Sequence, residues 1–392
     1  MKKELHPQTR AIRNQLTRTP EREHSSPIFL TSSFVFESAE QARAMFADEI
    51  PGNIYSRYSN PNSNELIEKL NFLEGTEDGI TTASGMAAMY CSMAALLKSG
   101  DHVLACRSVF GSTHQILTRL FPRVGIAHSY VDAAKPETWE KAILPNTKMI
   151  FVETPSNPAL EIIDLAWLGK LAEKHGIILN VDNCFATPVL QNPSQYGAHL
   201  VTHSATKYID GQGRVLGGVV LGKAELIKEI RFFARHTGPA LSPFNAWLLS
   251  KSLETLHLRM QGHCSNALKL AETLQGHPEI TKVIYPHLKS HPQFDLAKRQ
   301  MLMGGGVFSF ELRGGLDAGK KFLNSLELIS HSPNLGDSRT IAVHPASTTH
   351  SKLTEEERQA VGITPGLIRI SAGLEYCDDI LDDIQQALSN AH

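Results

Sequence analysis

Two side chains suited to covalent and charge chemistry follow predicted strands in the middle of the chain. Asp182 ends the apolar run 177–182, and Lys207 follows the run 200–204 in a loop that leads into the glycine-rich segment 211–214. A lysine alone is usually a solvated surface charge, but an unpaired carboxylate at the end of an apolar strand costs several kcal/mol to bury. Asp182 therefore requires a cationic partner, and an acid and a lysine at neighbouring strand ends indicate a reactive site.

A third segment offers donors for a phosphate group. Residues 82–88 lie between a predicted strand and a predicted helix, where Gly85 lets the backbone approach a ligand and the helix N-terminus supplies N–H groups. Ser84 at this position is also typical of an ordinary helix N-cap. Ser204 and Thr206, on either side of the lysine motif, add hydroxyl donors. An acid for a ring nitrogen, a lysine for an aldehyde and donors for a phosphate are what pyridoxal 5′-phosphate (PLP) requires.

The elements that position these residues predict an α/β fold. Between residues 80 and 222, short β-rich runs alternate with longer helical ones, as is typical of a doubly wound, mostly parallel sheet. Ligands of such sheets bind at the carboxyl ends of the strands, where Asp182 and Lys207 are expected. Strands are expected at 80–83, 102–105, 128–131, 149–153, 177–182, 200–204 and 219–221, and helices at 86–98, 112–121 and 165–175.

Three parts of the chain are predicted. Residues 1–53 lack clear periodicity and are expected to form an arm that contacts other subunits, with a frayed terminus as the alternative. Residues 54–245 are expected to form a large PLP-binding domain. Residues 246–392 are expected to form a long linking helix and a smaller α+β C-terminal domain. In this last region the expected elements are one helix at 245–274, strands at 282–285, 307–311, 326–331 and 367–371, and helices at 316–324 and 379–388.

Six short motifs occur in order along the chain. They are YSRYSNP at 55–61, SGM at 84–86, ETPSNP at 153–158, VDN at 181–183, SATKY at 204–208 and RISAGLE at 369–375. Together they resemble the Cys/Met-metabolism family of PLP-dependent enzymes, and the resemblance covers residues 27 to 388. It implies fold type I, the aspartate-aminotransferase-like α/β fold, whose doubly wound sheet is followed by a smaller α+β C-terminal domain.

The resemblance implies how PLP would be held. Lys207 would form the Schiff base with the cofactor and act as a catalytic residue, and Asp182 would pair with the pyridinium nitrogen. Phe110 would stack on the ring. The phosphate would be bound by Gly85, Met86, Ser204 and Thr206.

The resemblance also implies substrate and subunit contacts. Arg369 would clamp the α-carboxylate of the substrate, since a planar guanidinium matches a planar anion. Asn157 would lie near the ring oxygen of the cofactor or near the substrate carboxylate, and Asn334 would contact the substrate. Tyr55, a second catalytic residue, and Arg57 would reach the phosphate from the neighbouring subunit. The active site would then form only at a dimer interface, and the family resemblance favours a homotetramer built from two such dimers.

Two departures from the commoner family pattern narrow the expected activity. Phe110-Gly111 stands where many members have Tyr-Gly, and phenylalanine has no hydroxyl with which to move protons. The proton transfers would then fall to Lys207, with Tyr55, and a lyase activity is disfavoured. The alternative is that Phe110 is a core aromatic residue that does not contact the cofactor. Asn334 begins an Asn-Leu-Gly-Asp run where several γ-synthases and lyases have serine. With the segment 211–214, these features resemble the O-succinylhomoserine sulfhydrylases.

That resemblance implies γ-replacement of succinate by sulfide to give L-homocysteine. The alternatives that share the cofactor are O-acetylhomoserine sulfhydrylase, cystathionine γ-synthase and methionine γ-lyase. A non-catalytic paralogue would keep the fold and fail to bind PLP. A nicotinamide-dependent enzyme is disfavoured because no G-x-G-x-x-G follows a strand.

Composition excludes several other classes. The 392 residues carry a formal charge of −2 without a block of like charge, so no nucleic-acid or anionic-membrane surface is expected. Apolar runs fall far below the roughly 18 residues of a membrane span, the N-terminus has no secretory pattern, and a cytoplasmic protein is expected. His287 with His291 and His199 with His203 have the i,i+4 spacing of metal ligands, but no third ligand is near, so no metal is expected.

Overall fold

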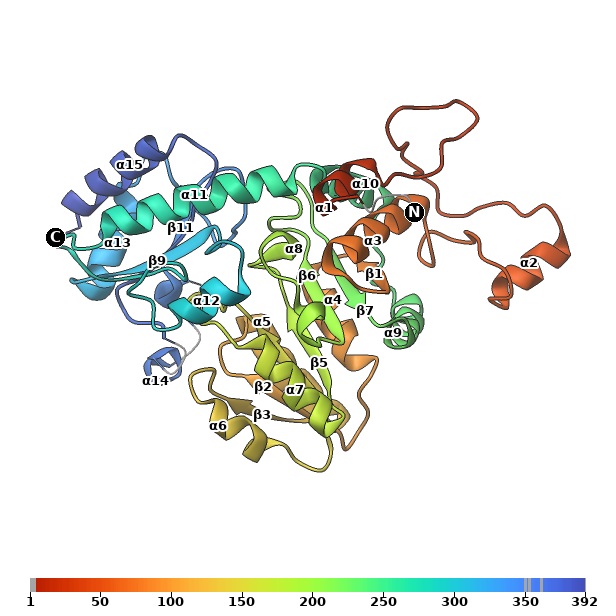
Figure 1. The fold of residues 1–392 in the computed structure, drawn as a ribbon, viewed down its shortest axis with the longest axis horizontal. Helices are drawn as coiled ribbons and strands as arrows, with labels where there is room; N and C mark the ends of the chain where they lie inside the picture. The colour runs from red at the N-terminus through yellow and green to blue at the C-terminus, as the bar shows by residue number, and fades with distance from the viewer. Residues whose placement is uncertain (1–4, 349–350, 352–353, 360–361, 392) are drawn as a thin grey trace.

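Two β-sheets organise the computed structural model, one in each half of the molecule (Figure 1). The structure describes residues 5–348, 351, 354–359 and 362–391. The larger sheet has seven strands in the order β1-β7-β6-β5-β4-β2-β3. These strands are β1 (Asp78–Thr82), β2 (His102–Cys106), β3 (Ala127–Val131), β4 (Thr147–Glu153), β5 (Ile178–Asp182), β6 (Leu200–Ser204) and β7 (Gly218–Gly222).

Five of the seven strands form a continuous parallel set, and β7 runs antiparallel to its neighbours β6 and β1. Successive residues of β4 pack into different cores: Met149 and Phe151 on one face, Ile150 and Val152 on the other. A sheet buried on both faces by helices is the doubly wound arrangement. The predicted fold class is therefore confirmed.

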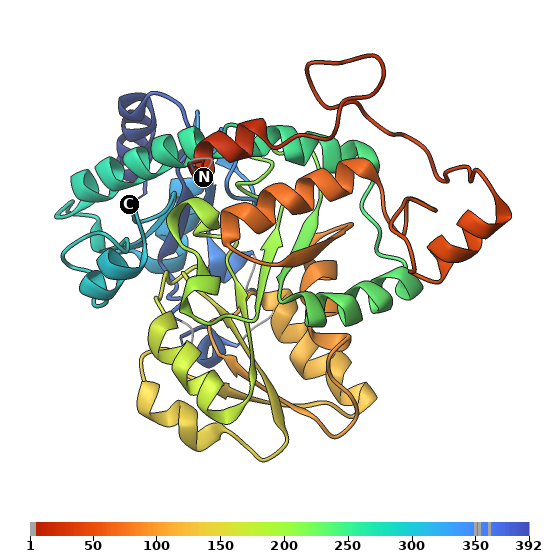
Figure 2. The same cartoon turned by 45° about the vertical axis from the view of Figure 1, so that its right-hand side comes forward.

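Helices of the larger half cover both faces of this sheet (Figures 1 and 2). α4 (Gly85–Ala94) contacts β6 and β7, while α7 (Leu165–His175) packs on β5 from the other side. The helix expected at 112–121 begins as α5 (Gly111–Gln115) and continues as a π-helical turn at Ile116–Leu120. The larger half also contains α3 (Pro61–Glu74), α6 (Pro136–Trp139), α8 (Thr187–Leu190) and α9 (Ala224–Thr237). Two short helices, α12 (Phe294–Gln300) and α14 (Glu355–Gln359), lie in the part of the chain that forms the smaller sheet.

The prediction of a single helix over residues 245–274 is wrong. The segment forms two helices, α10 (Pro243–Leu253) and α11 (Leu256–Leu274). At the break, the carbonyl of Ser252 accepts the N–H of Thr255 at 3.2 Å and, in addition, Nη2 of Arg259 at 2.9 Å. Arg259 Nη1 donates to the carbonyl of Tyr208, so the break ties α11 to the loop that contains Lys207.

The smaller sheet has the order β10-β11-β12-β9-β8 and is covered by α11, α13 (Gly315–Ser325) and α15 (Cys377–Ser389). The strand expected at 326–331 is largely wrong, because only Ser330–His331 pairs, as β10. The carboxylate of Asp383 on α15 accepts the N–H groups of residues 327, 328 and 329, so these donors do not join a ladder. The other strands are β8 (Ile280–Ile284), β9 (Val307–Leu312), β11 (Ile341–Val343) and β12 (Leu367–Ser371).

The N-terminal part of the chain projects from the body. After α1 (Pro7–Arg13), an extended segment with α2 (Ala39–Phe46) reaches away from both sheets (Figures 1 and 2). Its apolar side chains are unusually open, with Val35 99% and Leu30 68% exposed. The role of residues 1–53 in subunit contacts, and the boundaries at 53/54 and 245/246, stay predictions.

Candidate active site

A cavity of about 590 Å³ opens where the carboxyl ends of β4, β5 and β6 face the smaller sheet. Residues as far apart in sequence as Ser84 and Arg369 meet in its wall. The predicted site residues that line it are Gly85, Met86, Phe110, Asn157, Asp182, Ser204, Thr206, Lys207, Asn334 and Arg369. The rule that ligands bind at the carboxyl ends of parallel strands therefore located the cavity correctly.

One end of the cavity is built to receive an anion. Ser84 caps α4, because its Oγ accepts the N–H of Ala87 at 3.2 Å, and the first N–H groups of this helix lie beside Ser204. The approach is so close that a Cβ on Gly85 would lie 2.4 Å from the Cβ of Ser204. Only glycine fits there, and free N–H groups with the helix dipole and hydroxyls suit a phosphate.

Lys207 lines the cavity and bonds to a residue of the smaller half. Its Nζ donates to Oδ1 of Asn334 at 2.6 Å. Burial lowers the pKa of Lys207 from its usual value, which increases the fraction of neutral amine. A neutral amine is the form that reacts with an aldehyde and that accepts a proton from carbon.

Asp182 is a buried acid that no described lysine, arginine or histidine pairs with in a salt bridge. Its Oδ1 accepts the N–H of Cys184 at 3.0 Å, and among the described residues it forms no ion pair. Burial raises the pKa of Asp182 to about 6. A pyridinium nitrogen would supply the missing positive charge, so the acid, the amine and the anion-binding helix end fit PLP together.

Arg369 on β12 closes the opposite side of the cavity. Its side chain is 2% exposed, Nη1 donates to Oδ1 of Asn157 at 3.0 Å, and Nη2 donates to the carbonyl of Asn334 at 2.9 Å. Within the described part of the chain its Nε has no hydrogen-bond partner. Burial lowers the pKa of Arg369 to about 10. A substrate carboxylate would satisfy both the charge and the unpaired N–H.

Tyr55 and Arg57 do not line this cavity. They lie on the N-terminal segment beside residues 240–243, where Tyr55 is 42% exposed and Arg57 bonds to the carbonyl of Arg235. Their position leaves them free to contact another molecule. The implied contribution to a neighbouring subunit's active site stays a prediction.

Several of the described residues that line the cavity received no role in the sequence prediction, and Glu153 is the one among them that carries a carboxyl group. Glu153 ends β4 and lines the cavity, and its Oε2 accepts the N–H of Phe110 at 2.9 Å. It begins the ETPSNP motif, and the strand-end argument used for Asp182 applies equally to it. Met89, Thr113 and Cys184 also line the wall.

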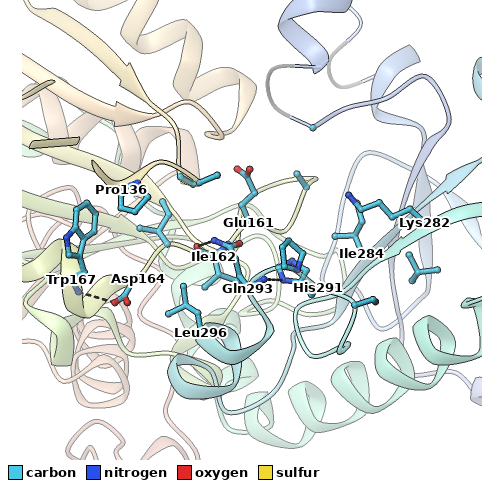
Figure 3. Close-up of a pocket in the computed structure, with 18 of the residues that line it drawn as sticks. Pro136, Glu161, Ile162, Asp164, Trp167, Lys282, Ile284, His291, Gln293 and Leu296 are labelled. Carbon is cyan, nitrogen blue, oxygen red and sulfur yellow. Dashed lines mark hydrogen bonds between the residues drawn. The ribbon is translucent and has the colours of Figure 1, made fainter. Parts of the chain in front are cut away.

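A second cavity, of about 720 Å³, lies between the loop after β4 and the smaller half, and shares no lining residue with the first (Figure 3). Gln293, just before α12, holds both backbone groups of Ile162, accepting the N–H at 2.7 Å and donating to the carbonyl. Ile162 belongs to the same loop as Asn157. The contact therefore fixes, from the smaller half, the loop that carries the partner of Arg369.

Two further findings concern the described residues. They contain no group of three His, Cys, Asp or Glu side chains placed to hold a metal ion. His203, of one i,i+4 pair, instead contacts Glu74, with Nε2 2.6 Å from Oε1. No helix within them has both the length and the apolar character needed to cross a membrane.

The fold and the site define a PLP-dependent enzyme of fold type I. A family model for Cys/Met metabolism PLP-dependent enzymes matches residues 8–389, and the chain belongs to this family. An O-succinylhomoserine sulfhydrylase of Pseudomonas aeruginosa is 50% identical over 381 residues, 97% of this chain and 94% of that protein. An L-methionine gamma-lyase of Porphyromonas gingivalis is 43% identical over 93% of this chain and 92% of that protein.

The structural comparison agrees with the family. The crystal structure of a putative O-acetylhomoserine (thiol)-lyase from Campylobacter jejuni matches with a TM-score of 0.95 at 35% identity. The match covers 98% of this chain and 100% of that one, and that enzyme carries N'-pyridoxyl-lysine-5'-monophosphate. The cofactor of this family is PLP.

Proposed function

We propose that the protein is an O-succinylhomoserine sulfhydrylase, which replaces the succinate of O-succinyl-L-homoserine by sulfide and releases L-homocysteine. The observation that carries the proposal is the 50% identity with a sulfhydrylase along nearly the whole of both chains. The cavity agrees with it, because Phe110 offers no hydroxyl and Asn334 contacts the reactive lysine.

The proposed reaction divides its work among the cavity residues. Arg369 binds the substrate α-carboxylate, and Asp182 holds the ring nitrogen while Phe110 covers the ring face. PLP, when bound, supplies an electron sink for negative charge that develops beside the amino nitrogen. Lys207 Nζ would take a proton from Cα, release it into the conjugated system that bound PLP supplies, and then take a proton from Cβ as the Cγ–O bond to succinate breaks. After sulfide adds at Cγ, Nζ would return one proton to Cβ and one to Cα. Asn334 Oδ1 keeps Nζ at the cavity wall.

The missing hydroxyl at position 110 distinguishes the candidate reactions. Succinate leaves as a stable carboxylate and needs no proton from the protein. A thiolate leaves from methionine, and its conjugate acid has a pKa several units above that of a carboxylic acid, so its departure is helped by an acid. Phe110 cannot be that acid, although the 43% identity with a methionine gamma-lyase makes that activity the second candidate.

Homocysteine formation tests the proposal. The purified, PLP-loaded protein is given sulfide and, in parallel, O-succinyl- or O-acetyl-L-homoserine, with cysteine replacing sulfide as a control. We expect homocysteine and a clear preference for the succinyl ester. Preference for the acetyl ester would assign the other sulfhydrylase, and cystathionine from cysteine would assign a γ-synthase. In a separate assay the protein is given methionine alone, and release of 2-oxobutanoate there would identify a lyase.

We further infer a cytoplasmic homo-oligomer, a tetramer of two catalytic dimers, in which Tyr55 and Arg57 complete the neighbouring site. The exposed apolar side chains of the N-terminal segment support a second copy as its neighbour. Mixing an inactive Lys207→Ala chain with an inactive Arg57→Ala chain tests this arrangement. Shared sites would regain part of the activity in the mixture, and self-contained sites would not.

A further inference from the structure

Two carboxylates end neighbouring strands at the same level of the large sheet. Glu153 of β4 and Asp182 of β5 are register partners in a parallel pair, so both side chains point to the same face. Neighbouring strands lie about 4.8 Å apart. Both residues line the Lys207 cavity and are nearly buried, with 3% and 7% exposure. The two acids therefore share one small space from which water is largely excluded.

The positive charge that acts on Glu153 comes from Arg369, and it lowers the pKa of Glu153 by less than burial raises it. Among the described residues neither acid forms an ion pair, and the nearest guanidinium, Arg369, directs Nη1 to Asn157 and Nη2 to backbone carbonyls. The thiol of Cys184 also faces the acids, and burial raises its pKa, so that it stays neutral. Two unpaired anions a few ångströms apart in a dry site are strongly unfavourable. One of the two acids must keep a proton.

The bonds of each acid decide which one keeps the proton. Asp182, in the role proposed above, faces a pyridinium cation and is the acid that gains from a negative charge. Glu153 accepts the N–H of Phe110 with Oε2 at 2.9 Å, a contact that the carbonyl oxygen of a neutral carboxylic acid can also make. Burial and the neighbouring Asp182 both raise the pKa of Glu153 well above its usual value.

We propose that Glu153 is a positioning residue held as a neutral carboxylic acid, which fixes the backbone of Phe110 and leaves Asp182 as the single anion beside the cofactor. The inference rests on the proposed role of Asp182. One negative charge then balances one pyridinium, whereas an ionised Glu153 would place a second, unbalanced charge in the wall. A neutral acid at a buried functional site is a known physical solution to this problem.

A neutral isostere provides the test. Glu153→Gln keeps an oxygen for the Phe110 N–H and an N–H₂ donor in place of the hydroxyl, so we expect its PLP dissociation constant to stay within about threefold of wild type. Glu153→Ala leaves the buried N–H of Phe110 unpaired and is expected to weaken PLP binding by about tenfold or more. Binding is followed by the cofactor's visible absorbance, which reports on the ring environment independently of turnover.

Infrared difference spectroscopy gives a second, direct readout. The PLP-loaded wild type is expected to show the carbonyl stretch of a buried, protonated carboxylic acid at neutral pH, and Glu153→Gln is expected to lack it. Glu161→Gln is the matched control, because Glu161 is outside the cavity wall and bonds to Ser108; this variant should keep the band.

Either of two results overturns the proposal: a band that persists in Glu153→Gln, or a glutamine variant that loses PLP as severely as the alanine variant. If Glu153→Ala does not fold, PLP binding by Glu153→Gln and the infrared band still test whether Glu153 is a neutral acid. No readout uses a substrate, so a wrong assignment of the ester or the nucleophile leaves the test intact.

Discussion

Arg369→Lys is the substitution whose effect follows most directly from the geometry of the site. The guanidinium is held in one plane by Asn157 and by the carbonyls of Pro333 and Asn334, and its Nε is unpaired among the described residues. Lysine keeps the charge but offers a point donor in place of a planar fork. We therefore expect the loss of one charge-assisted hydrogen bond to the substrate carboxylate.

The size of the effect follows from that single bond. A hydrogen bond to a charged group contributes about 1.5–3 kcal/mol, which corresponds to a fall in kcat/KM of roughly 10- to 150-fold. The carboxylate does not change during the reaction, so the bond is equally strong in ground and transition states. The loss should therefore appear mainly as a higher KM, with kcat little changed.

Steady-state homocysteine formation at varied ester concentration measures this division. The visible absorbance of bound PLP should be unchanged, because the proposed contact is with substrate. Arg231→Lys, which alters a guanidinium that is bonded to Asp78 at the start of β1 and lies outside the cavity wall, is the matched control and should leave KM unchanged. A fall in kcat at constant KM would refute the assignment of Arg369 to the carboxylate.

Two further substitutions test the burial of acids. In PLP-free protein the raised pKa of Asp182, about 6, means that its stabilising contribution is complete below pH ~4 and is lost as pH rises through 6. Asp182→Asn should therefore raise the free energy of unfolding of the PLP-free protein by up to ~3 kcal/mol at pH 8, seen as a higher melting temperature, and should not raise it at pH 4. An equal rise at both pH values would contradict the assigned pKa. Asp383→Ala removes the acceptor of three N–H groups and should destabilise by about 2–4 kcal/mol in denaturant titrations, a loss that Asp382→Ala, beside it on α15, should not reproduce.

Local pattern was sufficient for much of the fold. The expected runs 200–204 and 367–371 match β6 and β12, and 165–175 matches α7. Periodicity and turn residues act over a few positions, so they can be read from neighbours in the chain. Two predictions failed where a side chain binds backbone groups outside the local pattern. Arg259 binds the carbonyl of Tyr208, 51 positions away, from the start of α11, and Asp383 binds the N–H of Ile329, 54 positions away.

The candidate site divides in the same way. The types and order of Asp182, Lys207 and the Ser84-Gly85 turn determined, from the sequence alone, an expected PLP site at the strand ends. Only the tertiary structure brought Arg369 to Asn157, 212 positions away, and placed Glu153 beside Asp182. Strand order and the packing of the two sheets create these contacts, and neither is encoded within a local stretch of chain, because each depends on the free energy of burying surfaces that are remote in sequence.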